Sequence, residues 1–438
     1  MVLFSVIPVW AGPEPLTFPN APTCPARSVE LVMVGDVMQH GMQLRASRQS
    51  DGSTSWRGVF DAVQPLIENA DLALANLETP VDEAQDFGGF PYFNAPESLL
   101  DALTVAGFDV LQTANNHCLD RRRDGALATF EAVRRHGFGS AGTWPSAEAR
   151  DTPWVIESLA GPVSVAFLAY TYGTNGLPMP EGEPWLVNWL DVGQMEHDIV
   201  RARALADVVV VGVHWGAEYQ HQPMAWQRDM AHRLVDAGAD VVMGSHPHVL
   251  QPSEVVSVVR PEGPRDALVL YSLGNFVSNQ REAYREGGML ARVTVAHCVD
   301  TGETHVVDAR FTPVWVDDRL ADGELAFRVL PVMPFDAECP SGLDLSASDC
   351  KRMEAFRDHA ADLFPAADFS WDAGPNPWTA QRPVRHPLLP TGFLEGPPAD
   401  RPVPPSASVW PPPGLVRTQR DEVADGASVE STSGQESR

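Results

Sequence analysis

The chain has almost no lysine, since Lys351 is the only one among its 438 residues. Basic residues are few overall, with 31 Lys and Arg against 58 Asp and Glu and a formal net charge of -27. Because like charges repel at long range, this balance argues against nucleic acid and anionic membranes as partners. An anionic polymer would need a cation bridge or a local basic patch. The reliance on arginine reflects either bidentate anion recognition or codon bias, and the scattered positions favour codon bias.

Long apolar runs are also missing. The first 12 residues form a short apolar stretch like the hydrophobic part of a secretory signal, although no basic residue precedes it and Pro8 interrupts it. A misplaced start codon and a ragged terminus are the alternative explanations. No later stretch approaches the roughly 20 apolar residues of a membrane span. We therefore expect an extracytoplasmic protein, secreted or periplasmic, either free or held by its N-terminal segment.

Cysteine is scarce, and its number, five, is odd. Cys339 and Cys350 are close enough in sequence to close a small loop in an oxidising compartment, and we expect them to form a disulfide. Cys24 matches a lipoprotein acylation site poorly. Cys118 and Cys298 are interpreted as buried small hydrophobic residues.

A repeated pattern predicts the fold class. Four times a helix-like stretch is followed by a small residue, an aspartate and an apolar run, with the aspartates at positions 71, 109, 207 and 240. Runs of Val, Leu and Ala are typical of strands that helices cover on both faces. Helical spacing occurs at 59–67, 99–106, 126–135, 195–205 and 224–237. The sequence therefore predicts an α/β architecture.

Composition divides the chain into four parts. Residues 1–27 form an N-terminal segment that is interpreted as a signal remnant, and residues 28–316 form the α/β domain. Residues 317–371 are expected to be an appendage with one amphipathic helix near 353–364. Pro, Gly, Ser and Ala dominate residues 372–438, which we interpret as a disordered tail.

Polar residues follow the predicted strands. After the strands at 30–34, 72–75, 110–113, 208–213, 241–243 and 268–273 come Asp36, Asn76 with Glu78, Asn115-Asn116-His117, His214, His246-Pro247-His248 and Asn275. Open α/β sheets place their active sites at the carboxyl ends of the strands. We therefore expect these side chains to share one site.

The His246-Pro247-His248 element carries the clearest chemistry. Proline disfavours the helical conformation in the residue before it, so His246 is expected to be extended. In an extended segment, residues two apart project to the same side, so the two imidazoles would converge. Imidazole combined with carboxylate and amide oxygen suits a divalent transition metal such as Zn, Mn or Fe.

Each residue also has an ordinary explanation. Asp36 after a glycine is commonly a turn or cap residue, Asn115-Asn116 a turn, and His117 or His214 a hydrogen-bonded histidine. Their recurrence at successive strand ends favours a shared metal site.

The order of these residues resembles the calcineurin-like metallophosphoesterases. Finer motifs resemble the CapA family, which is associated with poly-γ-glutamate capsule synthesis: GDVM at 35–38, ANLE at 75–78, NNHCLD at 115–120, HWGAEY at 214–219, HPH at 246–248 and YSLGNF at 271–276. The resemblance covers about residues 29–297. It implies a four-layer α/β/β/α sandwich and two divalent metal ions.

The resemblance also implies a role for each candidate residue. Asp36 and His248 would hold one metal, Asn116, His214 and His246 the other, and Glu78 or Asn76 would bridge them. His117 would donate a proton to the leaving group or hold an oxygen of the scissile group. Asp120 would stand in for the acid that the superfamily places beside this histidine.

Met38 departs from the superfamily pattern, because it occupies the place of a metal-binding histidine. His40 lies two residues further on. We expect it to be a surface residue, and the alternative is that it folds back to fill the gap.

Three functions are compatible with these residues. The first is a hydrolase of a phosphoester or a γ-glutamyl amide in capsule or cell-envelope polymer metabolism, with an anionic polymer or a phosphoester as its substrate. The second is a non-catalytic, metal-bearing component of the capsule-synthesis or polymer-export machinery. The third is a structural metal site, which His117 disfavours because closed structural sites carry no spare acid.

The proline-rich segment generates a first prediction. Deleting the residues after Asp372 should scarcely change the midpoint of thermal unfolding, because a polar, Pro-rich tail buries little apolar surface. Calorimetry of the full-length and shortened chains measures this. A fall of about 10 °C would contradict it.

Overall fold

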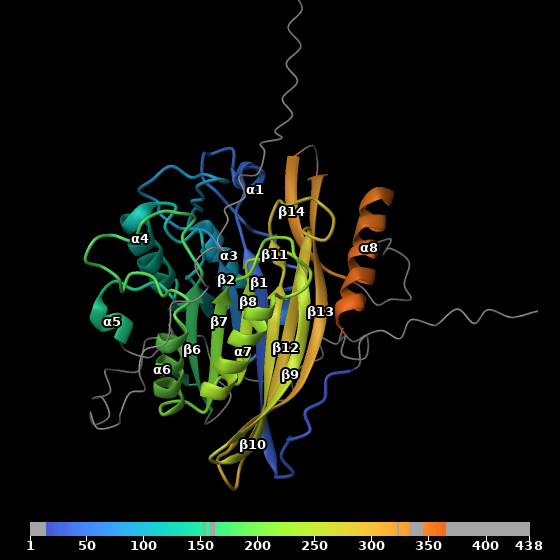
Figure 1. The fold of residues 1–438 in the computed structure, drawn as a ribbon. Helices are drawn as coiled ribbons and strands as arrows, with labels where there is room; N and C mark the ends of the chain where they lie inside the picture. Colours follow the sequence, from blue (N-terminus) through green and yellow to red (C-terminus); the bar gives the residue numbers. More distant parts are fainter. Residues whose placement is uncertain (1–14, 152–154, 158–162, 322–323, 333–344, 365–438) are drawn as a thin grey trace, which may run out of the picture.

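The computed structural model describes residues 15–151, 155–157, 163–321, 324–332 and 345–364 (Figure 1). One eight-stranded sheet contains β1 (Ala26–Val37), β2 (Leu72–Leu77), β3 (Val110–Gln112), β4 (Gly139–Ala141), β11 (Asn275–Val277), β12 (Gly287–Cys298), β13 (Thr304–Ala321) and β14 (Glu324–Pro331). Its order is β14-β13-β12-β1-β2-β3-β4, and β11 pairs with β1. The strands β1 to β4 are parallel, whereas β12 to β14 form an antiparallel extension.

The second sheet has six strands: β5 (Val155–Glu157), β6 (Ser164–Thr171), β7 (Val208–His214), β8 (Val241–Ser245), β9 (Leu250–Arg260) and β10 (Gly263–Leu273). Its order is β5-β6-β7-β8-β10-β9. The central strands β6, β7, β8 and β10 are parallel, and antiparallel β5 and β9 form the edges.

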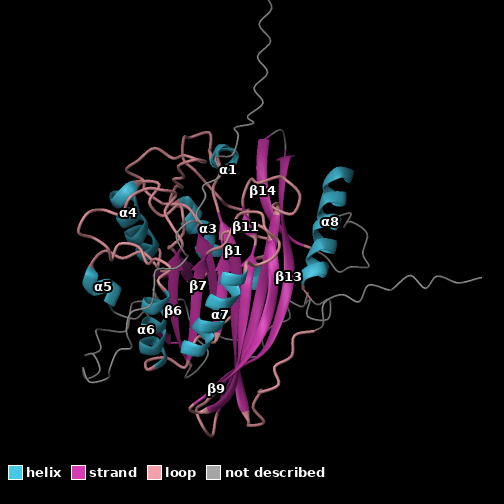
Figure 2. Cartoon of the chain, viewed as in Figure 1, coloured by secondary structure: helices cyan, strands magenta, loops and turns pink. Residues whose placement is uncertain are grey.

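Eight helices occur in the described residues: α1 (Gly41–Ser47), α2 (Gln64–Glu68), α3 (Ser98–Ala106), α4 (Arg122–Arg135), α5 (Ala147–Asp151), α6 (Val192–Arg203), α7 (Ala225–Ala237) and α8 (Ala347–Leu363). Figure 2 shows the helices arranged around the two sheets. Helices α2, α3 and α4 cover the outer face of the first sheet, and α6 and α7 cover that of the second. The chain therefore forms the predicted four-layer α/β/β/α sandwich.

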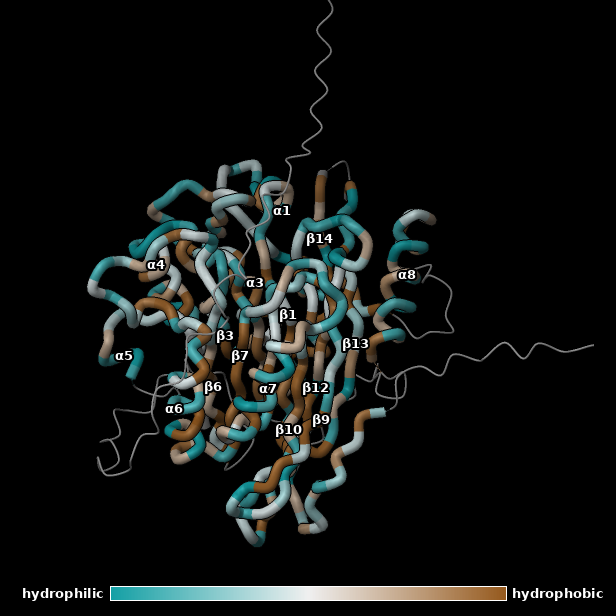
Figure 3. The backbone as a smooth tube through the Cα atoms, in the orientation of Figure 1, coloured by the Kyte–Doolittle hydropathy of each residue, from teal (hydrophilic) through white to brown (hydrophobic). Residues whose placement is uncertain are grey.

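Alternation along each strand explains the layers. In β1, Leu31 and Met33 belong to the core between the two sheets, whereas Val32 and Val34 belong to the core beneath the helices. Successive side chains of a strand point to opposite faces, so a strand between two apolar layers must be apolar throughout. The apolar colouring of the central strands in Figure 3 reflects this double burial.

Most predicted elements are present. The expected strands at 30–34, 72–75, 208–213 and 241–243 lie inside β1, β2, β7 and β8. The helix expected at 59–67 is wrong in its first half, since only Gln64–Glu68 is helical and the preceding residues form turns. Pro65 stands in the first turn of α2, where a missing N–H costs no hydrogen bond.

The C-terminal part of the described chain holds the expected amphipathic helix, α8. Its Phe356 and Met353 are buried in the core between the sheets. The domain boundary expected at residue 316 falls within β13, which continues the first sheet and pairs with β14. Residues 1–14 and 365–438 lie outside the described part, so the predicted signal remnant and tail stay predictions.

The cysteines differ from expectation in one respect. Cys24 and Cys298 form a disulfide across 274 residues of sequence, so the interpretation of Cys298 as an unbonded hydrophobic residue is wrong. Cys118 is free and buried, as predicted. Cys350 is disulfide-bonded, but the partner that we expected, Cys339, lies outside the described residues. Among the helices of the described residues, none is long and apolar enough to cross a membrane.

The disulfide generates a second prediction. Cys24→Ser with Cys298→Ser should lower the free energy of unfolding by about 2–5 kcal/mol, because the bond restricts the unfolded chain. Urea denaturation measures the loss. The single Cys298→Ser variant should lose as much as the double variant, since either change breaks the same bond. Unchanged stability in both would contradict a structural role for the disulfide.

Candidate metal centre

Two buried carboxylates lie at the carboxyl ends of β1 and β2. Asp36 pairs in register with Asn76, and the Asn76 Nδ2 donates hydrogen bonds to Asp36 Oδ1 at 2.8 Å and Glu78 Oε2 at 3.2 Å. All three side chains are fully buried. Gly35, next to Asp36, lets the backbone of Gly274 lie close to β1, because a Cβ at Gly35 would be 1.9 Å from the carbonyl oxygen of Gly274. The amide of Asn76 thus holds two acidic groups together.

Three histidines approach from the second sheet. His214 ends β7, and His246 and His248 follow β8. The ring centroids of His214 and His246 are 4.8 Å apart, and those of His246 and His248 are 5.9 Å apart. The rings therefore converge, as expected.

The backbone that brings the two rings of the HPH motif together is not extended, however. His246 has φ 99° and His248 has φ 57°, both in the left-handed region. The expectation of an extended His246 is therefore wrong. Positive φ is uncommon for residues other than glycine, and such strain concentrates at functional sites.

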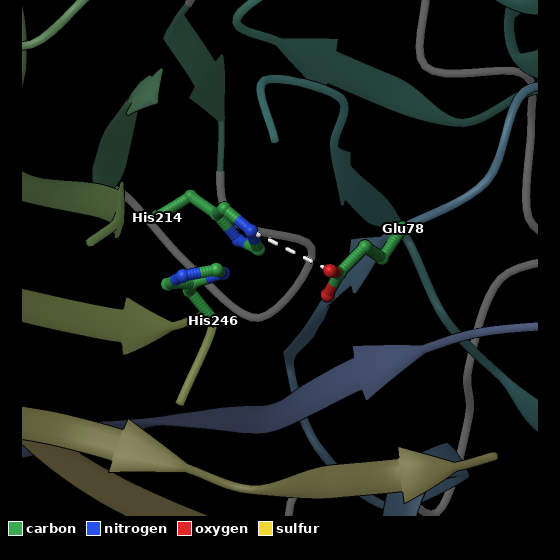
Figure 4. A group of neighbouring side chains, drawn as sticks. All are labelled: Glu78, His214 and His246. Carbon is green, nitrogen blue, oxygen red and sulfur yellow. Dashed lines mark ion pairs between the residues drawn. The ribbon is translucent and has the colours of Figure 1, made fainter. Parts of the chain in front are cut away.

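Among the residues that the structure describes, the convergent atoms form three groups that could hold a metal ion. These are Glu78, His214 and His246; Asp36, Glu78 and His248; and Glu218, His246 and His248. Within each group the ligand atoms lie within 4.8 Å of one another. Figure 4 shows His214 and His246 facing Glu78, whose Oε1 is 3.5 Å from His214 Nε2. Because Glu78 belongs to the first two groups, it lies between two candidate positions.

The electrostatics of the site fit a cation. Burial and the charge of Asp36 raise the pKa of Glu78 well above its usual value. Burial and neighbouring histidines lower the pKa of His214 and His246 well below the usual range, so both rings are neutral, as metal ligands must be. Glu78 Oε1 and His246 Nδ1 are buried without a hydrogen-bond partner. Such orphaned polar atoms are costly unless something fills the site.

His248 differs from the other two histidines. Its Nδ1 lies 3.0 Å from Asp36 Oδ2 and 3.1 Å from Asn275 Oδ1. Burial acts to lower the pKa of His248, but the hydrogen bond and charge of Asp36 outweigh it and raise the pKa. The Nε2 remains directed to the centre, 3.7 Å from Glu78 Oε1.

His117 and Asp120 form a second buried pair. The His117 Nδ1 lies 2.8 Å from Asp120 Oδ2, which also accepts the backbone N–H of Phe93 at 2.7 Å. A carboxylate only accepts hydrogen bonds, so Nδ1 carries the proton and Nε2 is left as the reactive nitrogen. The ring of Phe93 packs edge-on against His117 at 4.5 Å.

Asn116 links this pair to the histidines. Its Oδ1 lies 2.8 Å from His214 Nε2, and its Nδ2 donates to Asn175 Oδ1 at 3.1 Å. The Nδ2 of Asn175 lies 3.4 Å from His117 Nδ1, a close approach and not a hydrogen bond, because Nδ1 already donates its proton to Asp120. The structure thus brings every predicted site residue into one connected cluster.

Some residues at the site were given no role from sequence, although Asn275 was among the strand-end residues expected there. Glu218 faces His246 and His248, Asn275 contacts His248, and Asn175 accepts a hydrogen bond from Asn116 and lies beside His117. Glu218 and Asn275 stand inside the HWGAEY and YSLGNF motifs, which was the available signal. Asn175, with φ 51°, and Tyr172, whose ring is 4.5 Å from His246, follow β6, a strand that we did not predict.

The place of the missing histidine is occupied by a buried Met38, which is 2% exposed. His40 neither lies free on the surface nor fills the gap, because its Nδ1 accepts the backbone N–H of Asn279 and its ring packs on Phe93. No candidate metal group among the described residues includes His40, whereas Glu218 joins one.

Comparison with known proteins identifies the family. A protein-family model, described as bacterial capsule synthesis protein PGA_cap, matches residues 30–280, which is more than half of the chain. The capsule biosynthesis protein CapA of Bacillus anthracis is 30% identical over 260 residues, which cover 57% of this chain and 60% of that protein. The PGA biosynthesis protein CapA of Bacillus subtilis is 29% identical over 62% of this chain and 68% of its own length.

A solved phosphatase structure from Mycoplasma pneumoniae has 14% identity and a TM-score of 0.36, over 66% of this chain and 94% of that one, a likeness too low to inform the fold. The matched region spans only about 60% of the length of the B. anthracis relative. The family resemblance that the motifs predicted is nevertheless confirmed. The chain belongs to the bacterial capsule synthesis protein family PGA_cap.

Proposed function

We propose that this chain is a metal-dependent hydrolase that acts on an anionic polymer or phosphoester in capsule or cell-envelope metabolism, cleaving a phosphoester or a γ-glutamyl amide. One observation carries the proposal: Glu78 is shared by two groups of metal-ligand atoms, one with His214 and His246 and the other with Asp36 and His248. A shared carboxylate between two positions is the arrangement expected of a two-metal hydrolase.

The residues have distinct roles in this proposal. Two divalent ions of Zn, Mn or Fe would supply a water of lowered pKa and would stabilise charge that develops on the attacked group. Asp36 and His248 would hold one ion, His214, His246 and the Oδ1 of Asn116 the other, and Glu78 would bridge them. The Nδ2 of Asn76 donates to both carboxylates, so in this proposal Asn76 orients them and Glu78 takes the bridging place.

His117 would deliver the proton. Asp120 fixes the Nδ1 proton, so Nε2 is the nitrogen that protonates the leaving group or holds an oxygen of the scissile group. The same hydrogen bond holds the ring of His117 in one orientation. A non-catalytic assembly or export component would need the metal groups but no such pair. The buried His117–Asp120 pair therefore favours hydrolysis over that alternative.

The proposed location is extracytoplasmic. The Cys24–Cys298 disulfide supports it, because disulfides persist in oxidising compartments. The CapA relatives are named for capsule biosynthesis, which also supports a role at the cell envelope and contact with capsule-synthesis machinery.

A third prediction concerns stepwise metal loading. The His214–His246 position offers two rings that burial holds neutral, whereas the other position offers the single ring of His248, and Met38 adds no imidazole there. His246→Ala should therefore remove most bound metal, and His248→Ala should keep close to one equivalent. Elemental analysis after metal-supplemented expression measures both. His232→Ala is the control, since this exposed histidine pairs with Glu254 on the outer surface.

Two equal, tight sites in a calorimetric titration of the unmodified protein would contradict this order of loading. Metal below about a tenth of an equivalent in the unmodified protein would contradict the metal centre itself.

A fourth prediction separates proton transfer from metal binding. His117→Ala should leave the metal content nearly intact and lower turnover about 100-fold or more, because a general acid acts without being a ligand. Turnover is measured on phosphoesters and on poly-γ-glutamate. Loss of metal together with activity would show that the role assigned to His117 is wrong.

A further inference from the structure

Arg285 lies in the turn before β12, and its main chain is tied to the candidate metal centre. The Asn275 Nδ2 donates a 2.7 Å hydrogen bond to the carbonyl oxygen of Arg285. The Oδ1 of the same side chain lies 3.1 Å from His248 Nδ1. One amide side chain therefore connects Arg285 to a candidate ligand.

The guanidinium of Arg285 lies over an aromatic ring that also borders the centre. Its Cζ is 3.3 Å from the ring centroid of Tyr219, and that ring is 6.1 Å from the ring of His248. Tyr219 directly follows Glu218, and its backbone N–H donates to the carbonyl of Pro247, between the two histidines. Stacking of this kind fixes a guanidinium while leaving its in-plane N–H donors available.

Those donors have no acceptor within the described residues. The nearest carboxylate is Glu282, whose Oε2 is 3.7 Å from Arg285 Nη1, beyond hydrogen-bond distance, and whose side chain is 66% exposed. By contrast, Arg121 donates to two backbone carbonyls and Arg123 donates to Glu183 at 2.6 Å, so these arginines after Asp120 are engaged. The side chain of Arg285 is 27% exposed, so a ligand can reach it.

The turn that carries Arg285 is also held from the opposite side. The ring of Tyr284, at φ 71°, packs 4.2 Å from His359 of α8. Arg352 of α8 donates to the carbonyl of Arg281 at 3.0 Å. Contacts with α8 on one side and with Asn275 on the other thus fix the position of Arg285.

The negative charge around the candidate centre would hinder the binding of an anionic substrate. Asp36, Glu78 and Glu218 line the candidate centre of a strongly acidic chain, so an anionic substrate meets repulsion on approach. A guanidinium fork matches the two oxygens of a carboxylate or phosphate. We propose that Arg285, stacked on Tyr219, is an anion subsite that binds a carboxylate or phosphate group of the substrate beside the metal centre. The subsite rests on the proposed function only in treating the bound anion as substrate.

Calorimetry on the metal-loaded, full-length protein tests the subsite with two probes, inorganic phosphate and tetra-γ-glutamate. Arg285→Ala should weaken binding of at least one probe about 10- to 100-fold, the effect of losing hydrogen bonds to a charged group. The affinity of Arg285→Lys should lie between those of the unmodified protein and Arg285→Ala, because lysine keeps the charge but lacks the forked donors of arginine. The matched control is Arg233→Ala, which removes the same charge from a pair with Glu196 on the outer helices.

Each outcome decides the question. Weaker binding of phosphate alone, or of tetra-γ-glutamate alone, by Arg285→Ala supports the subsite and identifies the anion that it binds. Equal binding by Arg285→Ala and Arg233→Ala for both probes would overturn it, as would an unmodified protein that binds neither. Metal content and unfolding temperature of Arg285→Ala should match the unmodified protein. Because binding is measured without turnover, a failure to hydrolyse any substrate would refute the proposed function and leave the subsite standing.

Discussion

The burial of two carboxylates, Asp36 and Glu78, at one point between the sheets is the constraint on which the rest of the site depends. Removing such groups from water is costly, and their mutual repulsion adds to the cost. The amide of Asn76 donates one hydrogen bond to each carboxylate, and His248 offers Asp36 a charge-assisted hydrogen bond. His214 and His246, however, are held neutral by burial. Divalent ions at the two proposed positions would supply the missing positive charge.

The fold delivers this cluster because the two sheets bring the carboxyl ends of their parallel strands together. β1 and β2 supply the oxygen atoms, and β7 and the residues after β8 supply the imidazoles. The apolar core between the sheets and the helices outside them fix these strands, so the polar groups sit on a rigid support. The antiparallel additions then build outward: the turn before β12 carries Arg285, and α8 holds that turn.

The sequence predicted the parts of the fold that depend on local pattern. Runs such as 208–213 are apolar throughout, and only a doubly covered strand needs that. The antiparallel strands β12 to β14 escaped prediction because they mix half-buried with buried positions and so lack a continuous apolar run. The site was predictable where ligands end strands, as at Asp36 and His214. The rest of the site depends on tertiary contacts. The left-handed backbone at His246 and the approach of Glu218 to two histidines cannot be derived from local pattern, although Glu218 stands in the HWGAEY motif. The pairing of Cys24 with Cys298, outside the site, is likewise set by the fold.

The most direct test of the metal centre is anomalous diffraction from crystals of protein produced with added manganese or zinc. Data on both sides of the metal absorption edge should show an anomalous peak about 2.0–2.2 Å from a Glu78 carboxylate oxygen and from nitrogens of His214 and His246. A weaker peak is expected across Glu78, beside Asp36 and His248. Maps with no anomalous density among these residues, in crystals whose protein contains metal by elemental analysis, would contradict a metal centre between the two sheets.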